Sequence, residues 1–247
     1  MQITFVALAA ATTLALGGCG ASTEPVKPED FVDSHARIVA VTVLDSTTGN
    51  GFVPMTIHWL PQNCSERIER VIVGHEPGYQ TMVTVETKLL TDVRCPQSGE
   101  DCISQSYTFD VPLFDRLVLT GYGGAVVLNV ANTVPPVSAG QHAVQVLQRS
   151  SLLPVSGVVV EHRSEVGSGN LLSTTTTDST GWAIALPGCP GNADGSTILM
   201  VTDPLWGCGF DALRFDAVMA PCRGKLRTYL LYGTMPPLPD VRTVIAF

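Results

Sequence analysis

The chain has 247 residues, of which 45% are hydrophobic and 15% charged, and its formal net charge is −8. An acidic surface repels phosphate backbones, which argues against nucleic acid as a partner. The length accommodates two domains of about 100 residues each, and the 23 glycines and 17 prolines favour strands and turns over helices.

The first residues have the pattern of an export signal. Residues 3–16 form a largely apolar run without a charged side chain, and this run is shorter than the roughly 20 residues of a transmembrane helix. The sequence L-G-G-C follows at residues 16–19 and resembles the lipobox of bacterial lipoproteins. The resemblance implies a signal peptide over 1–18, lipidation of Cys19 and anchoring in the bacterial envelope, with Gly20 favouring the outer membrane or cell surface. An ordinary secretory signal is the alternative, because no Lys or Arg precedes the apolar run.

Residues 19–35 are interpreted as the lipidated cysteine and a polar tether that contains two prolines. A first β-sandwich domain is predicted over 36–134. Because Pro54 cannot donate a hydrogen bond to a neighbouring strand, the strand around it is expected at a sheet edge or after the proline. The stretch 95–102 is expected to be a loop. The predicted strands of this domain span residues 37–44, 52–60, 80–86, 104–111, 116–120 and 125–130.

A rigid break at Val134-Pro135-Pro136 marks the predicted domain boundary, so a second domain is assigned to 135–247. Short strands at regular spacing, with turn residues between them, predict a β-sandwich. The predicted strands of this domain span residues 143–147, 157–162, 171–176, 182–186, 197–202, 212–218, 226–232 and 241–246.

The stretch 155–216 resembles a bacterial immunoglobulin-like domain of the invasin/intimin type. Its core is T-D-S-T-G-W-A at residues 177–183, which matches the T-D-x-x-G-x-A turn of that family. From the residues themselves, Asp178 can accept backbone hydrogen bonds within a turn, Gly181 can supply an unusual φ, and Trp182 opens the next strand. The expected fold class is therefore all-β, with two immunoglobulin-like β-sandwich domains after a cleaved signal peptide.

The cysteine count agrees with export. Six cysteines remain when Cys19 is set aside, and an even number in an exported chain predicts disulfides, although six cysteines allow 15 connectivities. In the predicted strand order of the second domain, Cys189 and Cys222 fall at the same end and Cys208 at the other. Cys189–Cys222 is therefore the candidate disulfide, which leaves Cys208 for the first domain or free.

The sequence contains no recognised catalytic motif. There is no G-x-S-x-G, and Gly167-Ser168-Gly169 is interpreted as a turn. His75-Glu76 lacks the second histidine of a zinc-protease helix. No cofactor, metal or catalytic residue is therefore expected. A copper or zinc site assembled from distant strands is left open, because the five histidines do not cluster in sequence. Calcium is a minor alternative at Asp178, Asp194 and Asp203, and Trp206 is the best candidate for an exposed contact.

These observations favour a non-enzymatic cell-envelope lipoprotein. Its expected role is structural, adhesive or ligand-binding, through loops or a sheet edge that contact a protein or glycan ligand. The alternatives are an accessory subunit of an envelope complex, or an enzyme whose site is built from loops of the first domain. A deep polar cleft with converging ionisable groups would favour the enzyme.

Overall fold

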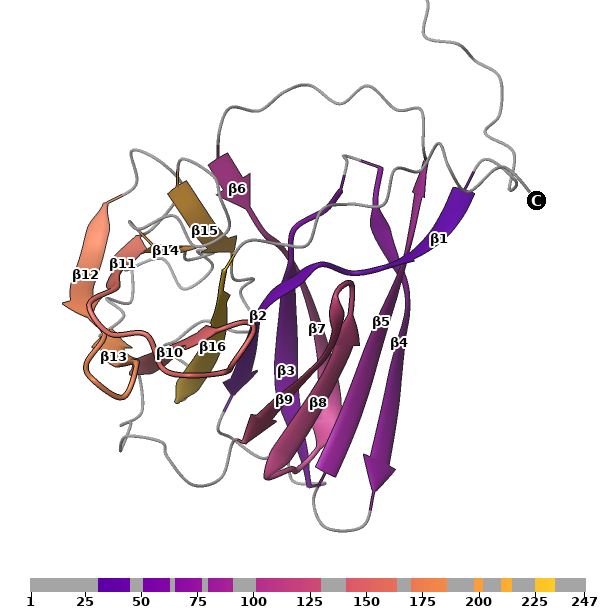
Figure 1. The fold of residues 1–247 in the computed structure, drawn as a ribbon, viewed down its shortest axis with the longest axis horizontal. Helices are drawn as coiled ribbons and strands as arrows, with labels where there is room; N and C mark the ends of the chain where they lie inside the picture. Colours follow the sequence, from indigo (N-terminus) through magenta and orange to yellow (C-terminus); the bar gives the residue numbers. More distant parts are fainter. Residues whose placement is uncertain are drawn as a thin grey trace, which may run out of the picture.

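The structure is a computed structural model that describes residues 31–44, 51–62, 65–76, 80–90, 101–129, 141–163, 170–185, 198–201, 210–214 and 225–233. All the regular elements in these ranges are strands, β1 to β16, so the predicted all-β class is confirmed (Figure 1). Within the same ranges, no helix has the length and apolar character needed to cross a bilayer.

The strands form three sheets. Sheet A contains β1 (Phe31–His35), β4 (Arg67–Glu76), β5 (Gln80–Leu90), β8 (Arg116–Gly121) and β9 (Gly124–Asn129). Sheet B has the order β13 (Trp182–Ala185), β10 (His142–Gln148), β16 (Leu226–Tyr232), β2 (Ile38–Leu44), β3 (Phe52–Trp59) and β7 (Gln105–Pro112). Sheet C has the order β12 (Leu171–Thr176), β11 (Val159–Arg163), β14 (Ile198–Val201), β15 (Phe210–Arg214) and β6 (Asp101–Ile103).

Sheet B is the middle layer of the molecule. All seven residues of β2 are buried, which is the pattern of a strand covered on both faces. Val41 and Val43 belong to the core shared with sheet A, whereas Ala40 and Leu44 belong to the core shared with sheet C. Sheets A and C therefore cover opposite faces of sheet B, as their places on the right and left of Figure 1 suggest.

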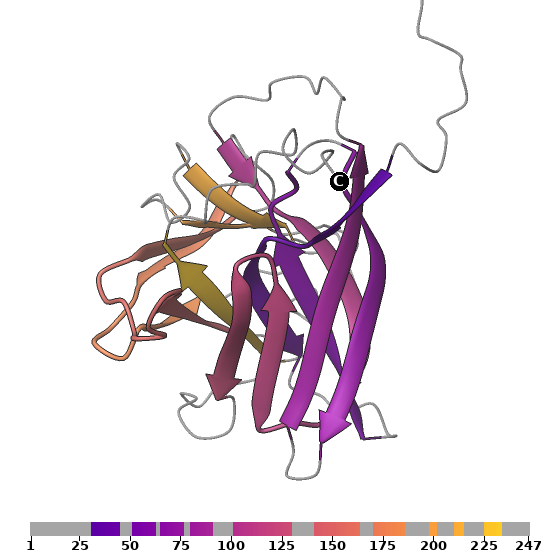
Figure 2. The same cartoon turned by 45° about the vertical axis from the view of Figure 1, so that its right-hand side comes forward.

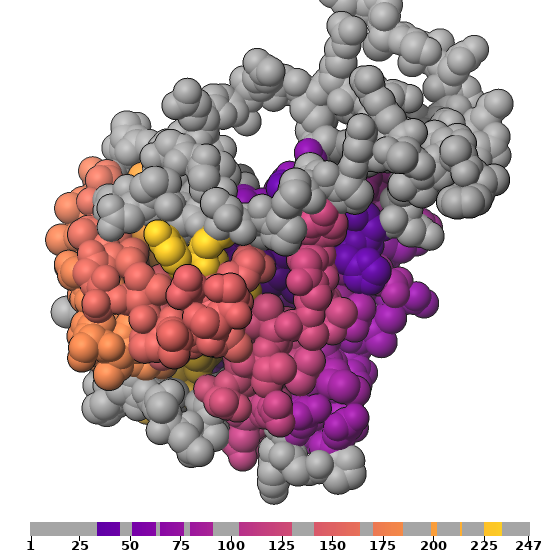
Figure 3. Space-filling view, viewed as in Figure 1, coloured from indigo at the N-terminus to yellow at the C-terminus, as the bar shows by residue number. Residues whose placement is uncertain are grey.

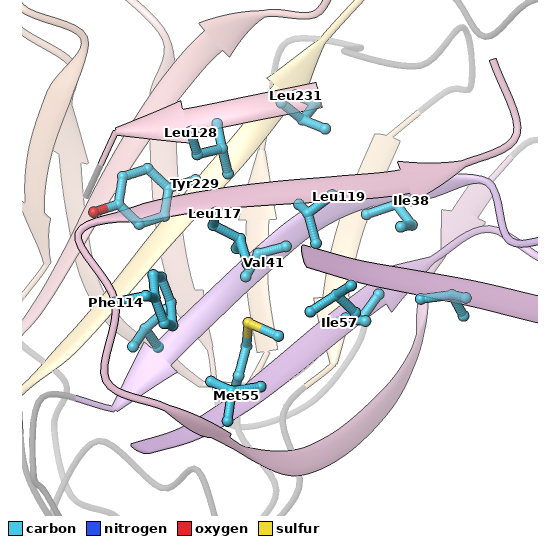
Figure 4. Close-up of a cluster of buried hydrophobic side chains, with 14 of the residues drawn as sticks. Ile38, Val41, Met55, Ile57, Phe114, Leu117, Leu119, Leu128, Tyr229 and Leu231 are labelled. Atoms are coloured by element: carbon cyan, nitrogen blue, oxygen red, sulfur yellow. The ribbon is translucent and has the colours of Figure 1, made fainter. Parts of the chain in front are cut away.

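The core between sheets A and B is continuous from β3 to β16 (Figure 4). Met55 and Ile57 of β3 are fully buried, and Leu117 of β8 packs in the same cluster. Farther along, the rings of Trp182 and Tyr229 meet edge to face, with centroids 5.7 Å apart, a geometry that aromatic pairs prefer. Burial of these large side chains is the main force that holds the two layers together.

The two halves of the chain share their sheets. Strand β16 pairs in parallel with β10 and antiparallel with β2, so it joins strands from both sides of the boundary proposed at residue 134. Strand β6 similarly pairs in parallel with β15 of sheet C. The division into domains 36–134 and 135–247 stays a prediction, but the hydrogen-bonded layers run across it.

The structure corrects three details of the sequence interpretation. Residues 31–35, assigned to the tether, form β1, because they extend the edge of β5 in antiparallel register. Residues 101–103, partly assigned to a loop, form β6. Strand β3 begins before Pro54 and lies inside sheet B. The proline is tolerated because the pairing with β2 begins only at Met55, which leaves Pro54 with a strand partner on one side.

Candidate functional site

A charged groove lies on sheet A, where β1 and β4 flank the C-terminal half of β5. It has a volume of about 570 Å³. The surface of β1 (indigo) adjoins that of β4 and β5 (purple) in the space-filling view (Figure 3). The groove is lined by Ser34, His35, Glu69, Arg70, Glu86, Thr87 and Lys88.

Strand alternation explains why charged side chains gather at this place. In β5, Val85 belongs to the core shared with sheet B and Leu89 is also buried, so Glu86 and Lys88 point to the opposite, outer face. The register brings His35 and Arg70 to either side of Glu86. Three strands thus place a row of charged and titratable groups on one face.

Each carboxylate of the groove is paired with a cation. Arg70 donates to Glu86 from Nε at 3.1 Å and from Nη2 at 2.7 Å, and Lys88 Nζ donates to Glu69 at 3.0 Å. The hydrogen bond from Lys88 lowers the pKa of Glu69. Two cations therefore balance two carboxylates on a chain that is acidic as a whole.

The chemistry of the groove suits reversible binding. Exposed ion pairs contribute only about 0–1 kcal/mol each, so an incoming charged group can share or replace a partner at small cost. A general acid needs a carboxyl pKa raised toward neutrality, whereas that of Glu69 is lowered. The two hydroxyls are engaged, because Ser34 accepts from Gln62 Nε2 at 2.9 Å and Thr87 donates to Glu66 at 2.7 Å.

A second polar cluster is buried between sheets B and C. The hydroxyls of Thr42 and Thr228 lie 2.7 Å apart and hydrogen-bond. Thr228 Oγ1 lies 2.7 Å from His142 Nε2, and Thr42 Oγ1 lies 3.0 Å from His58 Nε2. His162 of β11 completes the cluster, with its ring centroid 5.5 Å from that of His142. All five side chains are fully buried.

Burial favours the neutral form of His142 and His162. It lowers the pKa of His162 to about 4. It also lowers the pKa of His142, where the neighbouring His162 and His58 add to the effect. The fold thus brings together three of the five histidines that are distant in sequence. Even so, among the described residues no group of three or more His, Cys, Asp or Glu side chains is placed to hold a metal ion.

The turn proposed around Asp178 is confirmed. Asp178 Oδ1 accepts hydrogen bonds from the backbone and hydroxyl of Thr180 at 2.8 and 2.6 Å, and from the backbone of Trp182 at 3.1 Å. These bonds lower the pKa of Asp178. Gly181 has a φ of 75°, and β13 begins at Trp182.

Several residues singled out in the sequence lie outside the described residues. They are the lipidation candidate Cys19, the disulfide candidates Cys189 and Cys222, the calcium candidates Asp194 and Asp203, the contact candidate Trp206 and the glycine turn at 167–169.

Sequence reasoning missed the groove because two of its three strands were not recognised. Strand β1 was assigned to the tether, and β4 was not predicted. A usable signal was present in β4, where the β-branched run Val71-Ile72-Val73 is followed by Gly74. Comparison of the chain with protein-family models, curated proteins and solved structures gives no match. The groove must therefore be interpreted from its own chemistry.

Proposed function

We propose that this protein is a non-enzymatic lipoprotein of the bacterial envelope that binds a protein partner through the charged groove of sheet A. The observation that carries the proposal is the arrangement of Arg70–Glu86 and Lys88–Glu69 as two exposed, mutually neutralising pairs in one hollow. The immunoglobulin-like resemblance of residues 155–216 supports the same role, since many cell-surface binding domains share such sandwiches.

The charge pattern favours a protein over a glycan as the partner. Carbohydrates and other neutral ligands offer hydroxyls, whereas the groove offers two cations and two carboxylates. A polypeptide surface of mixed charge can satisfy both signs at once, and complementary charges of this kind give specificity and speed of association. Among the described residues that line the groove there is no Phe, Tyr or Trp, the side chains that present flat apolar faces to ligands.

Site-specific photo-crosslinking in cells tests the groove. A photoreactive residue at Ser34 is expected to capture a discrete protein, and the same residue at the exposed Thr174 of β12 is expected to capture none. Lys88→Glu should weaken capture from position 34 by about tenfold, because like charges juxtaposed in an interface cost on the order of 1 kcal/mol or more.

Two outcomes would contradict the proposal. Capture that is unchanged by Lys88→Glu would place the partner elsewhere. Binding of the purified protein to a glycan array, with loss of that binding in Lys88→Glu and no protein adduct in cells, would replace the protein partner by a glycan.

The anchor is tested separately with Cys19→Ala. Each buried methylene contributes about 0.8 kcal/mol to membrane affinity, so several acyl chains hold a protein firmly. The variant should move from the membrane fraction to the soluble fraction while its far-ultraviolet circular dichroism stays that of a β protein. Retention of Cys19→Ala in washed membranes would contradict the lipid anchor.

A further inference from the structure

Strand β4 is an edge strand of sheet A. Among the described residues it pairs only with β5, and it lies at the outer margin of the molecule in two views (Figures 1 and 2). It runs for 10 residues, Arg67–Glu76, with no buried position. Natural proteins usually shorten, bend or block such an edge, because its outward backbone groups can pair with another strand.

The centre of β4 is apolar on both faces. Ile72 is 42% exposed on the outer face and Val73 is 39% exposed on the inner face, although Val83, the register partner of Val73, is fully buried. Met82, which is 36% exposed, lies over Gly74, since its Cε is 3.2 Å from the position that a Cβ of Gly74 would occupy. An exposed apolar centre on an edge that the described strands leave unpaired is a surface suited to a partner.

The regularly paired part of β4 is arranged symmetrically about its midpoint, which favours a second copy of β4 as its partner strand. The only register shift against β5 falls between Ile68 and Arg70. The seven residues from Arg70 to Glu76 then pair without interruption, and Val73 is their midpoint. We propose that two copies of this chain associate through β4, antiparallel, about a two-fold axis that passes beside Val73 and joins the two A sheets into one.

Charge complementarity supports this register. An antiparallel pair centred on Val73 places Arg70 opposite Glu76 of the second copy, and symmetry repeats the pair at the other end. Both side chains lie on the outer face, because they alternate with Val71, Val73 and His75 of the inner face. Opposite charges directly across an antiparallel pair stabilise it, and like charges destabilise it.

The apolar residues fit the same register. Ile72 falls opposite Gly74 of the second copy, where Met82 of that copy lies over the glycine. Each Ile72 therefore meets a methionine side chain rather than a second branched residue. On the inner face Val73 meets its own symmetry mate. The contact has an apolar centre between two ion pairs, which is the usual anatomy of a protein interface.

This association does not depend on the proposed function of the groove, but it affects the geometry of binding. A two-fold axis perpendicular to a sheet keeps the outer faces of both copies on the same side. Two grooves would then face one partner surface, and bivalent engagement would raise the apparent affinity without any new contact.

A charge-swap experiment tests the register. The full chain carrying Cys19→Ala is expected to be a dimer by sedimentation equilibrium. Arg70→Glu and Glu76→Arg, each added singly, should weaken the dimer by about tenfold or more, because each creates two like-charge pairs. An equimolar mixture of the two single variants should form a heterodimer, since every facing pair is then again of opposite charge.

The matched control is Lys88→Glu, which changes a charge on the same face of sheet A but outside residues 70–76. It should leave the dimer intact, while it weakens capture of a partner by the groove. A chain that stays monomeric at millimolar concentration would overturn the proposal. So would a dimer that either single variant leaves unchanged, or a mixture of variants that fails to associate.

Discussion

At pH 4 the protein is expected to be about 3 kcal/mol less stable than at pH 7 through His162 alone. Burial lowers the pKa of this histidine from 6.5 to about 4. In the unfolded chain the imidazole takes up a proton below pH 6.5, whereas in the folded chain it stays neutral until about pH 4. Between these values the unfolded state binds more protons, so stability falls as pH falls. His142, whose pKa is also lowered by burial, adds to the loss.

Urea unfolding at several pH values between 7.5 and 4.5 measures this effect. His162→Leu should flatten the dependence of the unfolding free energy on pH in this window, because it removes a proton acceptor of the unfolded state. At pH 7.5 the same variant should cost little. Neither ring nitrogen of His162 has a hydrogen-bond partner among the described residues, so no such bond is lost there.

Val160→Ala is the matched control. Val160 lies on the same face of β11 as His162 and is fully buried, so its truncation should lower stability by about the same amount at every pH. A pH slope that is equal in His162→Leu and in the unsubstituted chain would show that the buried histidines do not link folding to protons.

Tyr229→Ala is expected to lower the free energy of unfolding by about 3–5 kcal/mol, the range for a large aromatic side chain removed from a core. Tyr229 is 1% exposed and loses its edge-to-face contact with Trp182. The effect should reach both halves of the chain, because β16 is hydrogen-bonded to β10 on one side and β2 on the other.

Hydrogen exchange followed by mass spectrometry tells whether the chain unfolds as one cooperative unit or as two. Protection from exchange in β3 and in β10 should be lost at the same denaturant concentration. Tyr229→Ala should lower that concentration for both strands by the same amount. Leu153→Ala is the control, because Leu153 is 62% exposed and its truncation should change stability by less than about 0.5 kcal/mol. If β3 kept its protection after β10 had lost it, the two domains predicted from the sequence would unfold independently.

Local patterns predicted most strands, but they could not predict which strands pair. In β3, Val53, Met55, Ile57 and Trp59 alternate with the other residues and all face sheet A, so the periodicity was informative. Strand β2 is apolar at every position except Thr42 because both of its faces are covered. The same composition is compatible with several positions in a sheet. The pairing of β2 with β16 joins residues that lie far apart in the sequence, so no local pattern predicts it.

The groove and the histidine cluster were hidden for different reasons. Glu69 lies at the register shift of β4, which interrupts the alternation that would have indicated a strand. His58, His142 and His162 come from three strands in two sheets, and no spacing in the sequence brings them together. Asp178 was predicted correctly because its turn is made by neighbours within four residues.

The position of β16 in the middle sheet has a consequence for folding. Thr42 and Thr228 form a hydrogen bond although they lie 186 residues apart in the sequence. Sheet B therefore cannot be completed until almost the whole chain has been synthesised. Folds with a high contact order form slowly, because the entropy of closing long loops is lost before the contacts are gained. Until β16 has been synthesised, a growing chain leaves one edge of the largely apolar strand β2 unpaired. Truncations before residue 226 should therefore aggregate instead of folding as a smaller domain.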